Sequence, residues 1–374
     1  MKADSLIHQQ SKDIIEKRRI RIIAFYLPQF HPIPENDEWW GKGFTEWTNT
    51  AKAKPLFRGH YQPHIPADLG FYDLRVPETR KAQAEMAREY GIEAFCYYHY
   101  WFAGKRLLER PFNEVLSSGE PNFPFCLCWA NQTWTGIWHG VPNRILIEQT
   151  YPGDDDHINH FNVLLKAFSD KRYVTIDNKP LFIIYRPQEI PEIRKMIDLW
   201  RKLAEKSGLQ GLYLVGVSWD PSVSISKYGF DGSVTHKFPP LNRKVSKKNP
   251  VKWVIKEIYF MRGKPTIYSY KNIMFELYNH RNSDIEDYPC SIPNWDNTPR
   301  SGKNGLVFNE SNPELFRMHF KMAIDKIKKY SPEHKIIFIK SWNEWAEGNH
   351  LEPDLKFGKG YLNVIKEEVL KNSP

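Results

Sequence analysis

The chain has 374 residues, 41% of them hydrophobic, which suits one α/β barrel with insertions or two average domains. No apolar stretch approaches the roughly 18 residues that a membrane span needs. Residues 237–271 alone carry ten Lys or Arg and one acid, Glu257, which equals the formal net charge of +9, so the rest of the chain is near neutral. Because no nucleic-acid recognition motif accompanies this basic stretch, we expect no nucleic-acid partner.

Strand-like apolar runs alternate with helical patterns along the chain. The predicted strands cover residues 20–26, 92–98, 123–129, 181–185, 212–218, 230–236, 288–293 and 336–342, and the predicted helices cover 77–90, 155–168, 191–206, 313–329 and 361–370. This alternation predicts an α/β fold, a single (β/α)8 TIM barrel with a parallel sheet. We expect a polar N-terminal extension at 1–19 and one catalytic domain at 20–374, with a long first βα loop at 28–76 and a basic insertion at about 237–285, before the seventh strand.

Cysteine use and the first residues bear on the compartment. The four cysteines, Cys96, Cys126, Cys128 and Cys290, form no Cys-x-x-Cys pair, so we expect buried free thiols in a reducing compartment. The polar start of the chain lacks the apolar region of a secretory signal, which favours a cytoplasmic protein. The basic stretch at 237–271 could contact anionic lipid at the inner face of the membrane or an acidic glycan, and a solvated surface insertion explains it equally well. Nothing in the sequence indicates the oligomeric state.

The residues that follow the predicted strands have an unusual composition. Chemistry in such barrels lies at the carboxyl ends of the strands, and in this chain those positions are rich in Trp, Tyr, His and Asn. Their convergence predicts a deep aromatic cleft suited to sugars, although any one of them is more often structural than functional. The predicted substrate-binding residues are Tyr26, Gln29, His31, Trp47, Tyr98, His99, Trp101, Trp129, Asn131, Tyr185, Arg186, His236, Trp295 and Asn343.

Two carboxylates follow the last predicted strand. Glu344 and Glu347 are three residues apart, a spacing that in a helix or tight turn places side chains on one face, roughly 5–6 Å apart at Cβ. Paired carboxyl groups with aromatic walls are what the cleavage of a sugar acetal requires, so we predict that these two are catalytic. The N-terminus of a helix, where acidic residues favour the dipole, would give the same local pattern.

Long motifs in the chain resemble a known family. The segments 25–31, 39–47, 97–101, 129–131 and 342–345 (the last reading Trp-Asn-Glu-Trp) are similar to the WbsX-type family, named as glycosyltransferases of surface-polysaccharide clusters. They are also similar to glycoside hydrolase family 99, the endo-α-mannosidase-like enzymes. The resemblance covers residues 20–370 and implies a (β/α)8 barrel that retains anomeric configuration, acts on an oligo- or polysaccharide, and needs no metal or organic cofactor.

The same resemblance implies a role for each carboxylate. Glu344 would take the proton of the substrate 2-hydroxyl, whose oxygen attacks C1 to give a 1,2-anhydro sugar. Glu347 would protonate the leaving oxygen and then activate the incoming water or acceptor hydroxyl. The basic insertion and the long first loop depart from what we expect in the mannosidases, so the sugar and the linkage do not carry over.

Three other classes remain open. A glycosyltransferase with an activated sugar donor could use the Asp-x-Asp of Asp154, Asp155 and Asp156 to hold a metal, although these residues also suit the first turn of a helix. A metal-dependent hydrolase could use His157 and His160, which are expected on the surface of that helix. A non-catalytic carbohydrate-binding protein would have the same aromatic cleft, but it would not need two neighbouring acids.

Overall fold

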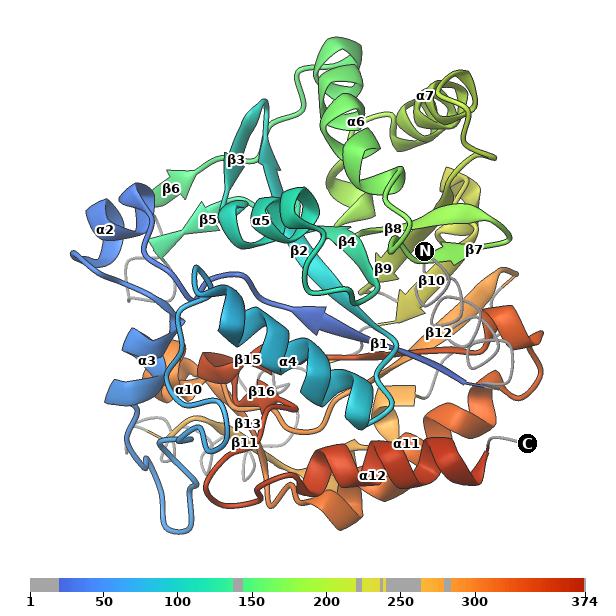
Figure 1. Ribbon diagram of the computed structural model, residues 1–374. Coiled ribbons are helices and arrows are strands. Elements are labelled where there is room, and N and C mark those ends of the chain that lie inside the picture. The colour runs from blue at the N-terminus through green and yellow to red at the C-terminus, as the bar shows by residue number, and fades with distance from the viewer. Residues whose placement is uncertain are drawn as a thin grey trace, which may run out of the picture.

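Eight parallel strands form a closed barrel in the computed structural model, which describes residues 20–136, 144–219, 224–235, 238–239, 264–278 and 284–372. The strands are β1 (Arg21–Tyr26), β2 (Ala94–Phe102), β4 (Phe125–Trp129), β8 (Lys179–Ile184), β9 (Tyr213–Ser218), β10 (Gly232–Thr235), β12 (Glu286–Ser291) and β14 (Ile336–Ile339). They pair in the order β1-β14-β12-β10-β9-β8-β4-β2, and β2 pairs back with β1 (Figure 1). The predicted TIM barrel is therefore confirmed, including its seventh strand.

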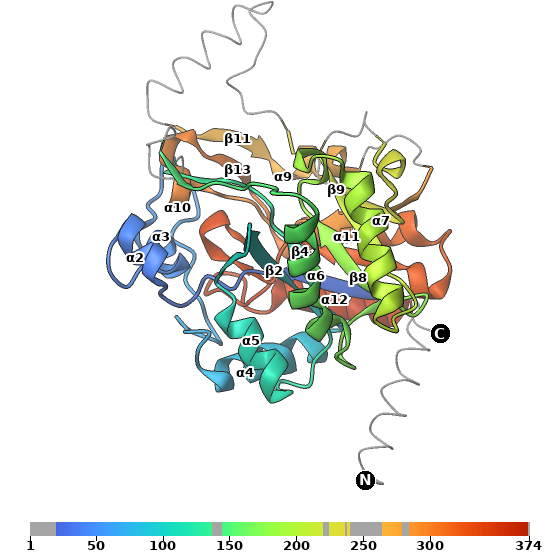
Figure 2. The same cartoon turned by 90° about the horizontal axis from the view of Figure 1, so that it is seen from above.

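Helices surround the barrel, as the view in Figure 2 shows. They are α4 (Pro77–Glu89), α5 (Arg110–Ser118), α6 (Asp154–Phe168), α7 (Ile193–Lys206), α11 (Pro313–Ile327) and α12 (Gly360–Lys371). Proline at the first position begins α4 and α11, where a missing N–H costs nothing. Asn312 caps α11 by accepting a hydrogen bond from the backbone of Leu315 at 3.0 Å.

Shorter elements follow the carboxyl ends of the barrel strands, and most of those labelled in Figure 1 lie on its left side. They include α2 (Pro34–Trp40), α3 (Glu46–Lys52), α9 (Tyr270–Ile273), α10 (Thr298–Ser301), and the strand pairs β5 (Trp134–Thr135) with β6 (Ile145–Ile147), β11 (Thr266–Ser269) with β13 (Leu306–Asn309), and β15 (Asn343–Glu344) with β16 (Asn349–His350). Two further strands pair antiparallel with barrel strands: β3 (Lys105–Leu107) with β2, and β7 (Thr175–Ile176) with β8. Turns of 3-10 helix lie at Pro187–Glu189, Ser226–Tyr228, Glu276–Tyr278, Gly302–Asn304, Pro332–His334 and Trp345–Glu347.

The structure describes only part of the predicted basic insertion at about 237–285 and does not cover the predicted N-terminal extension. Of the basic insertion, residues 264–278 contribute β11 and α9, and β11 pairs with β13 in parallel. Most of its basic residues lie outside the described residues, as do the extension at 1–19 and His236.

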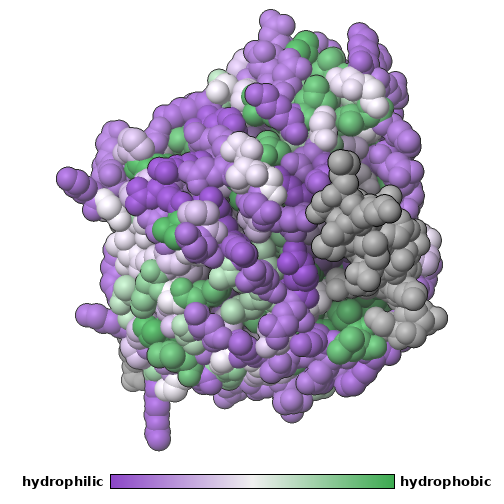
Figure 3. All heavy atoms as spheres, viewed as in Figure 1, coloured by the Kyte–Doolittle hydropathy of each residue, from purple (hydrophilic) through white to green (hydrophobic). Residues whose placement is uncertain are grey.

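The face of the molecule shown in Figure 3 is mainly polar. Hydrophilic side chains dominate the face shown in Figure 3, and its hydrophobic residues form small separate groups. Among the described residues, no helix combines the length and the apolar composition that crossing a bilayer requires.

Candidate active site

A short hairpin after β14 carries the two predicted catalytic carboxylates. Glu344 lies on β15 and Glu347 ends the 3-10 turn Trp345–Glu347, after which β16 returns antiparallel to β15. Gly348 makes this return with φ of +59°, and a Cβ there would lie 2.9 Å from the Cβ of Asp296. The pair therefore sits on a tight turn that packs closely on the loop after β12, and not at the start of a helix.

Asn343 fixes this hairpin to the end of β1. Its side chain accepts a hydrogen bond from the backbone N–H of Leu27 at 2.7 Å and donates to the Leu27 carbonyl at 3.1 Å. The side chain of Ser341 donates to the Asn349 carbonyl at 2.6 Å and accepts from the backbone N–H of Glu344 at 2.9 Å. These bonds join both strands of the hairpin to the barrel, so the position of Glu344 is set by the backbone around it.

A buried lysine pairs with Glu344. The Nζ atom of Lys340, which directly follows β14, lies 3.1 Å from Glu344 Oε2, and Asn349 donates to the same oxygen at 3.0 Å. Lys340 also donates to the hydroxyl of Tyr98 at 2.9 Å. Burial alone would lower the pKa of Lys340, but the negative charge of Glu344 outweighs this and holds the pKa above its ordinary value, so the lysine remains a cation.

A buried arginine joins Glu347 to a third carboxylate. Arg300, on α10, lies 2.7 Å from Glu347 Oε1 through one guanidinium nitrogen and 2.5 Å from Glu46 Oε1 through the other. Glu46, the first residue of α3, also accepts a hydrogen bond from the backbone of Ala346 at 3.2 Å. The first loop, the loop after β12 and the hairpin with Glu344 and Glu347 therefore meet at this one guanidinium group.

The charges of these groups do not cancel unless one carboxyl group holds a proton. Three carboxyl groups, Glu46, Glu344 and Glu347, face two cations, Lys340 and Arg300. Burial raises the pKa of Glu347 to about 7; Arg300 opposes this rise, and the charge of Glu344 adds to it. Near neutral pH Glu347 can therefore both give and take a proton, which is what a general acid that later acts as a base must do.

The two carboxylates open into a cavity of about 650 Å³ at the carboxyl end of the barrel. Its walls combine aromatic rings with a few polar groups, the composition typical of a sugar site. Besides Glu344 and Glu347, the side chains that line it include Gln29, Trp40, Phe44, Glu46, Asn49, Tyr98, Tyr100, Gln132, Trp134, Tyr185, Arg186, Trp219, Phe238, Trp295, Asn297, Arg300 and Lys340.

The cavity contains some of the predicted substrate-binding residues: Gln29, Tyr98, Tyr185, Arg186 and Trp295. His99 and Trp101 belong to β2 as Tyr98 does, but they point to the opposite face, since successive side chains of a strand alternate. His99 lies 2.9 Å from His160 of α6 between ring nitrogens, and the ring of Trp101 stacks on His160 at 4.6 Å. Both residues therefore pack between the barrel and the helices.

The remaining predicted residues that the structure describes do not line the cavity. Tyr26 donates to Gln83 of α4 at 2.7 Å, and Trp129 packs against Trp200 of α7 at 6.3 Å, so both face the helix layer. The others hold loops: His31 bonds to the Pro28 carbonyl at 3.0 Å, Trp47 donates to the Tyr72 carbonyl at 2.7 Å, Asn131 donates to the Arg186 carbonyl at 2.9 Å, and Asn343 binds Leu27 as described above.

Sequence reasoning left three charged residues out of the predicted site: Lys340, Arg300 and Glu46. Lys340 carried a usable signal, because a lysine inside the buried run 336–342 needs a partner. Arg300 and Glu46 lie in loops about 250 residues apart in the chain, and no local pattern predicts that they meet.

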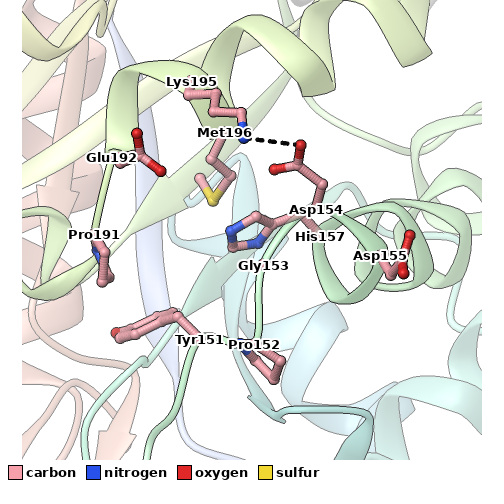
Figure 4. A pocket seen from close by; sticks show the side chains of 10 residues that line it. All are labelled: Tyr151, Pro152, Gly153, Asp154, Asp155, His157, Pro191, Glu192, Lys195 and Met196. Atoms are coloured by element: carbon pink, nitrogen blue, oxygen red, sulfur yellow. Dashed lines mark ion pairs between the residues drawn. The ribbon is translucent and has the colours of Figure 1, made fainter.

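The Asp-x-Asp of the alternative prediction lies elsewhere, at the start of α6. Asp154 forms an ion pair with Lys195 of α7 at 3.0 Å, the dashed line in Figure 4, and Asp155 points away from that pair. Asp156 instead accepts a hydrogen bond from the indole of Trp101 at 3.2 Å. The three carboxylates thus do not converge on one point, and they act as the favourable acidic first turn of a helix.

The two histidines of α6 are buried, contrary to our expectation of a surface position. His157 is 5% exposed and His160 is fully covered, because they lie on the face of α6 that packs against β2 and α7. Neither of them lines the cavity described above, which removes the reason for assigning them to a catalytic metal there.

A fourth buried acid, Glu352, supports the hairpin from outside the cavity. It accepts hydrogen bonds from the indole of Trp345 at 2.6 Å, the hydroxyl of Tyr72 at 2.8 Å and the amide of Gln83 at 2.6 Å. Burial raises the pKa of Glu352 to about 7, while these hydrogen bonds partly offset the rise. Glu352 therefore binds a proton more tightly in the folded chain than in the unfolded chain.

This difference predicts a pH-dependent stability. Between the ordinary pKa near 4.5 and the folded value near 7, the unfolded chain has lost the proton that the folded chain keeps, so stability falls as pH rises through this window. We expect urea unfolding of wild type to lose on the order of 1–3 kcal/mol from Glu352 between pH 5 and pH 8. Glu352→Gln should lose less over that range, and the exposed control Glu205→Gln should match wild type. If the free energy of unfolding changed equally with pH in all three proteins, Glu352 would not be the source of the pH dependence.

Comparison with protein families gives one match over most of the chain. The family described as Glycosyltransferase WbsX matches residues 22–365. Two curated proteins named "Uncharacterized protein WxcX", from Xanthomonas campestris pv. campestris strains B100 and ATCC 33913, are 37% identical to this chain over 353 residues. That alignment covers 94% of this chain and 50% of the relatives, so the chain spans about half the length of the curated relatives it matches.

Comparison with solved structures agrees on the architecture. A "Glycoside hydrolase-like protein" superposes with a TM-score of 0.59 at 16% identity and covers 94% of each chain. The GH99 endo-alpha-mannosidase from Bacteroides thetaiotaomicron superposes with a TM-score of 0.55 at 15% identity, covering 94% of this chain and 96% of that one. At these identities the likeness establishes the fold, and the predicted relation to the GH99 barrel is confirmed at that level.

Proposed function

Because the chain belongs to the WbsX family of glycosyltransferases, we propose that it is a carbohydrate-active enzyme that breaks or transfers glycosidic bonds. Its substrate is a cell-surface polysaccharide of the O-antigen or capsule type, or a precursor of one. The observation that carries the proposal is the hairpin with Glu344 and Glu347. Both carboxyl groups face one aromatic cavity, the first is paired with Lys340, and the second has a pKa raised to about 7.

In the first step the substrate 2-hydroxyl gives its proton to Glu344 while O2 attacks C1. The bond from C1 to the leaving oxygen breaks, and that oxygen takes the proton of Glu347. The sugar is left as a 1,2-anhydro ring, with Glu344 protonated and Glu347 ionised. In the second step Glu347 takes a proton from water or an acceptor hydroxyl, whose oxygen attacks C1. O2 leaves and takes its proton back from Glu344, so the configuration at C1 is retained.

The surrounding residues suit this chemistry. Lys340 lies next to Glu344 and can stabilise its charge before it accepts the proton. Arg300 holds Glu347 in place and is itself held by Glu46, so the acid is oriented by a second pair of buried charges. The rings of Trp40, Trp134, Trp219 and Trp295 can stack on the faces of successive sugars.

A glycosyltransferase that uses an activated sugar donor is the second candidate. The name of the family favours it, and the same acid/base pair could serve an acceptor hydroxyl in place of water. Against a nucleotide donor, the Asp-x-Asp is engaged with Lys195 and Trp101 and does not line the cavity. We therefore rank cleavage or transglycosylation first.

We place the reaction in the cytoplasm. The thiols of Cys96, Cys126 and Cys128 are buried and form no disulfide, a state that a reducing compartment maintains.

The test is activity on surface polysaccharide purified from the source organism, with products followed by mass spectrometry. Wild type and Glu347→Gln are incubated with and without nucleotide sugars. We expect fragments from wild type without any nucleotide, and at least about 100-fold fewer fragments from the variant. Chain growth that requires a nucleotide sugar would instead support the second candidate and contradict the proposed mechanism.

A further inference from the structure

A buried group of metal-ligand side chains lies beside the catalytic hairpin, outside the cavity. His64 Nδ1 lies 2.9 Å from His350 Nε2, which in turn lies 3.9 Å from Asp354 Oδ2. One ligand atom from each residue lies within 4.8 Å of the other two, and the residues are only 2%, 4% and 3% exposed. We refer to these three residues as the His-His-Asp cluster.

The neighbours of the cluster orient its ligand atoms; without an ion, His64 Nδ1 donates to His350 Nε2 at 2.9 Å, and the Tyr61 side chain hydrogen-bonds to Asp354. The ring of His350 contacts the Glu352 carbonyl through Nδ1 at 2.8 Å, and because a carbonyl only accepts, Nδ1 carries the proton and Nε2 presents a lone pair. Asp354 Oδ1 accepts hydrogen bonds from the backbone N–H groups of Lys356 at 2.8 Å and Phe357 at 2.6 Å, while Oδ2 faces His350. Outer contacts of this kind orient ligands in metal sites.

The backbone already holds the two contributing segments together. The N–H of Ala67 donates to the Pro353 carbonyl at 2.9 Å, and the N–H of Leu355 donates to the Ile65 carbonyl at 2.9 Å. His64 directly precedes Ile65, and Asp354 lies between Pro353 and Leu355. The ligand atoms are therefore brought together before any ion arrives, which lowers the entropic cost of binding one.

The charges in the cluster favour a cation. Both imidazole rings are almost fully buried, and each brings a ring nitrogen to the centre of the cluster. Within the described ranges of the chain, no Lys or Arg forms an ion pair with Asp354. A buried carboxylate in this setting gains from a positive ion nearby.

We propose that His64, His350 and Asp354 bind one divalent ion of the zinc class. Two imidazole nitrogens and a carboxylate oxygen suit zinc better than calcium or magnesium, which prefer oxygen ligands throughout. With zinc–ligand bonds of about 2.0–2.1 Å, tetrahedral ligand atoms lie roughly 3.3 Å apart. The observed separations of 2.9 Å and 3.9 Å lie on either side of that value. The third separation, between His64 and Asp354, is at most 4.8 Å, so side-chain adjustments would bring the three atoms around one ion, with water in the fourth position.

The ion would be structural, because the cluster does not line the cavity. The ring of His350 stacks on Trp345 at 3.8 Å, and His350 pairs with Asn343 across the catalytic hairpin. An ion bound to His64 as well would tie this hairpin to the first loop. The proposal does not depend on the proposed enzymatic reaction, and its test measures no activity.

The test begins with the full chain purified in zinc-supplemented medium and dialysed against metal-free buffer. We expect close to one zinc per chain by plasma mass spectrometry. Chelation should lower the melting temperature by several degrees, and added zinc but not magnesium should restore it. Cobalt in place of zinc should give the visible absorption bands of a tetrahedral site. Zinc at background level, with a melting temperature that neither chelator nor zinc changes, would leave only a hydrogen bond between two histidines and overturn the proposal.

Two variants assign the ligands. Asp354→Asn keeps an oxygen that can accept hydrogen bonds from the backbone N–H groups of Lys356 and Phe357. Asp354→Asn and His64→Gln should each reduce the bound zinc at least tenfold. Asp198→Asn, on the exposed side of α7, is the matched control and should keep wild-type zinc. Zinc retained in both ligand variants would overturn the assignment of these residues. The zinc content and the melting temperature of wild type test the proposal without any variant, so a variant that fails to fold does not affect that test.

Discussion

The Glu347→Gln variant is expected to turn over an unactivated polysaccharide about 10²- to 10⁴-fold more slowly than wild type, the usual contribution of a general acid. Glutamine keeps the shape and can still accept a hydrogen bond from Arg300, which lies 2.7 Å from Glu347 in wild type. It cannot give a proton to the leaving oxygen. The measurement is kcat/KM together with the affinity for the substrate, and the affinity should change little.

A leaving group of low pKa separates this role from a general loss of structure. An aryl glycoside that needs no protonation should be affected much less in its first step by Glu347→Gln than the natural linkage is. In wild type the rate should also fall as pH rises above about 7, when Glu347 loses its proton. An equal loss on both substrates would contradict the assignment of Glu347 as the acid. The control is Glu205→Gln, on the exposed side of α7, which should match wild type.

The Glu344→Gln variant should lose turnover by a similar factor, about 10²–10⁴, because the 2-hydroxyl no longer has a base. Unlike the loss in Glu347→Gln, this loss should persist with an aryl leaving group, since attack by O2 is needed whatever leaves. The variant also leaves Lys340, buried beside position 344, without its carboxylate partner. Its melting temperature must therefore be measured alongside kcat/KM.

A lysine variant distinguishes the loss of the base in Glu344→Gln from the destabilisation caused by an unpaired Lys340. Lys340→Met removes the cation but keeps the carboxylate of Glu344, and it should lower stability and activity together. If Glu344→Gln keeps wild-type stability and turnover on both substrates, Glu344 is not the base. If it keeps stability and loses turnover on both, the assignment is supported.

The barrel could be predicted from sequence because its strands are buried on both faces. Runs such as 22–26 and 336–339 are continuously apolar, a pattern typical of strands that are covered on both sides. The short helices α2, α3, α9 and α10 were not predicted, since four to seven residues are too few for a helical period. Their positions depend on tertiary contacts, such as the packing of α3 and α10 against the catalytic hairpin.

The parts of the candidate site that depend on local sequence could be predicted, and the parts that depend on tertiary contacts could not. Glu344 and Glu347 could be paired because they are local to one turn, and Tyr98 was included because it ends the predicted strand 92–98. His99 and Trp101 were placed in the cavity although β2 continues to Phe102, and its alternation turns both of them outward. The ion pairs of Arg300 with Glu46 and Glu347 join distant loops, and that information lies in the folded chain alone.

The configuration of the first product at its anomeric carbon tests the proposed mechanism most directly. Wild type is mixed with a glycan that it cleaves, and proton NMR follows the reaction before the free sugar equilibrates. Two displacements at C1, the first by O2 and the second by water, predict that the first product has the anomeric configuration of the substrate. A first product of inverted configuration would mean a single displacement by water, and would contradict the roles proposed for Glu344 and Glu347.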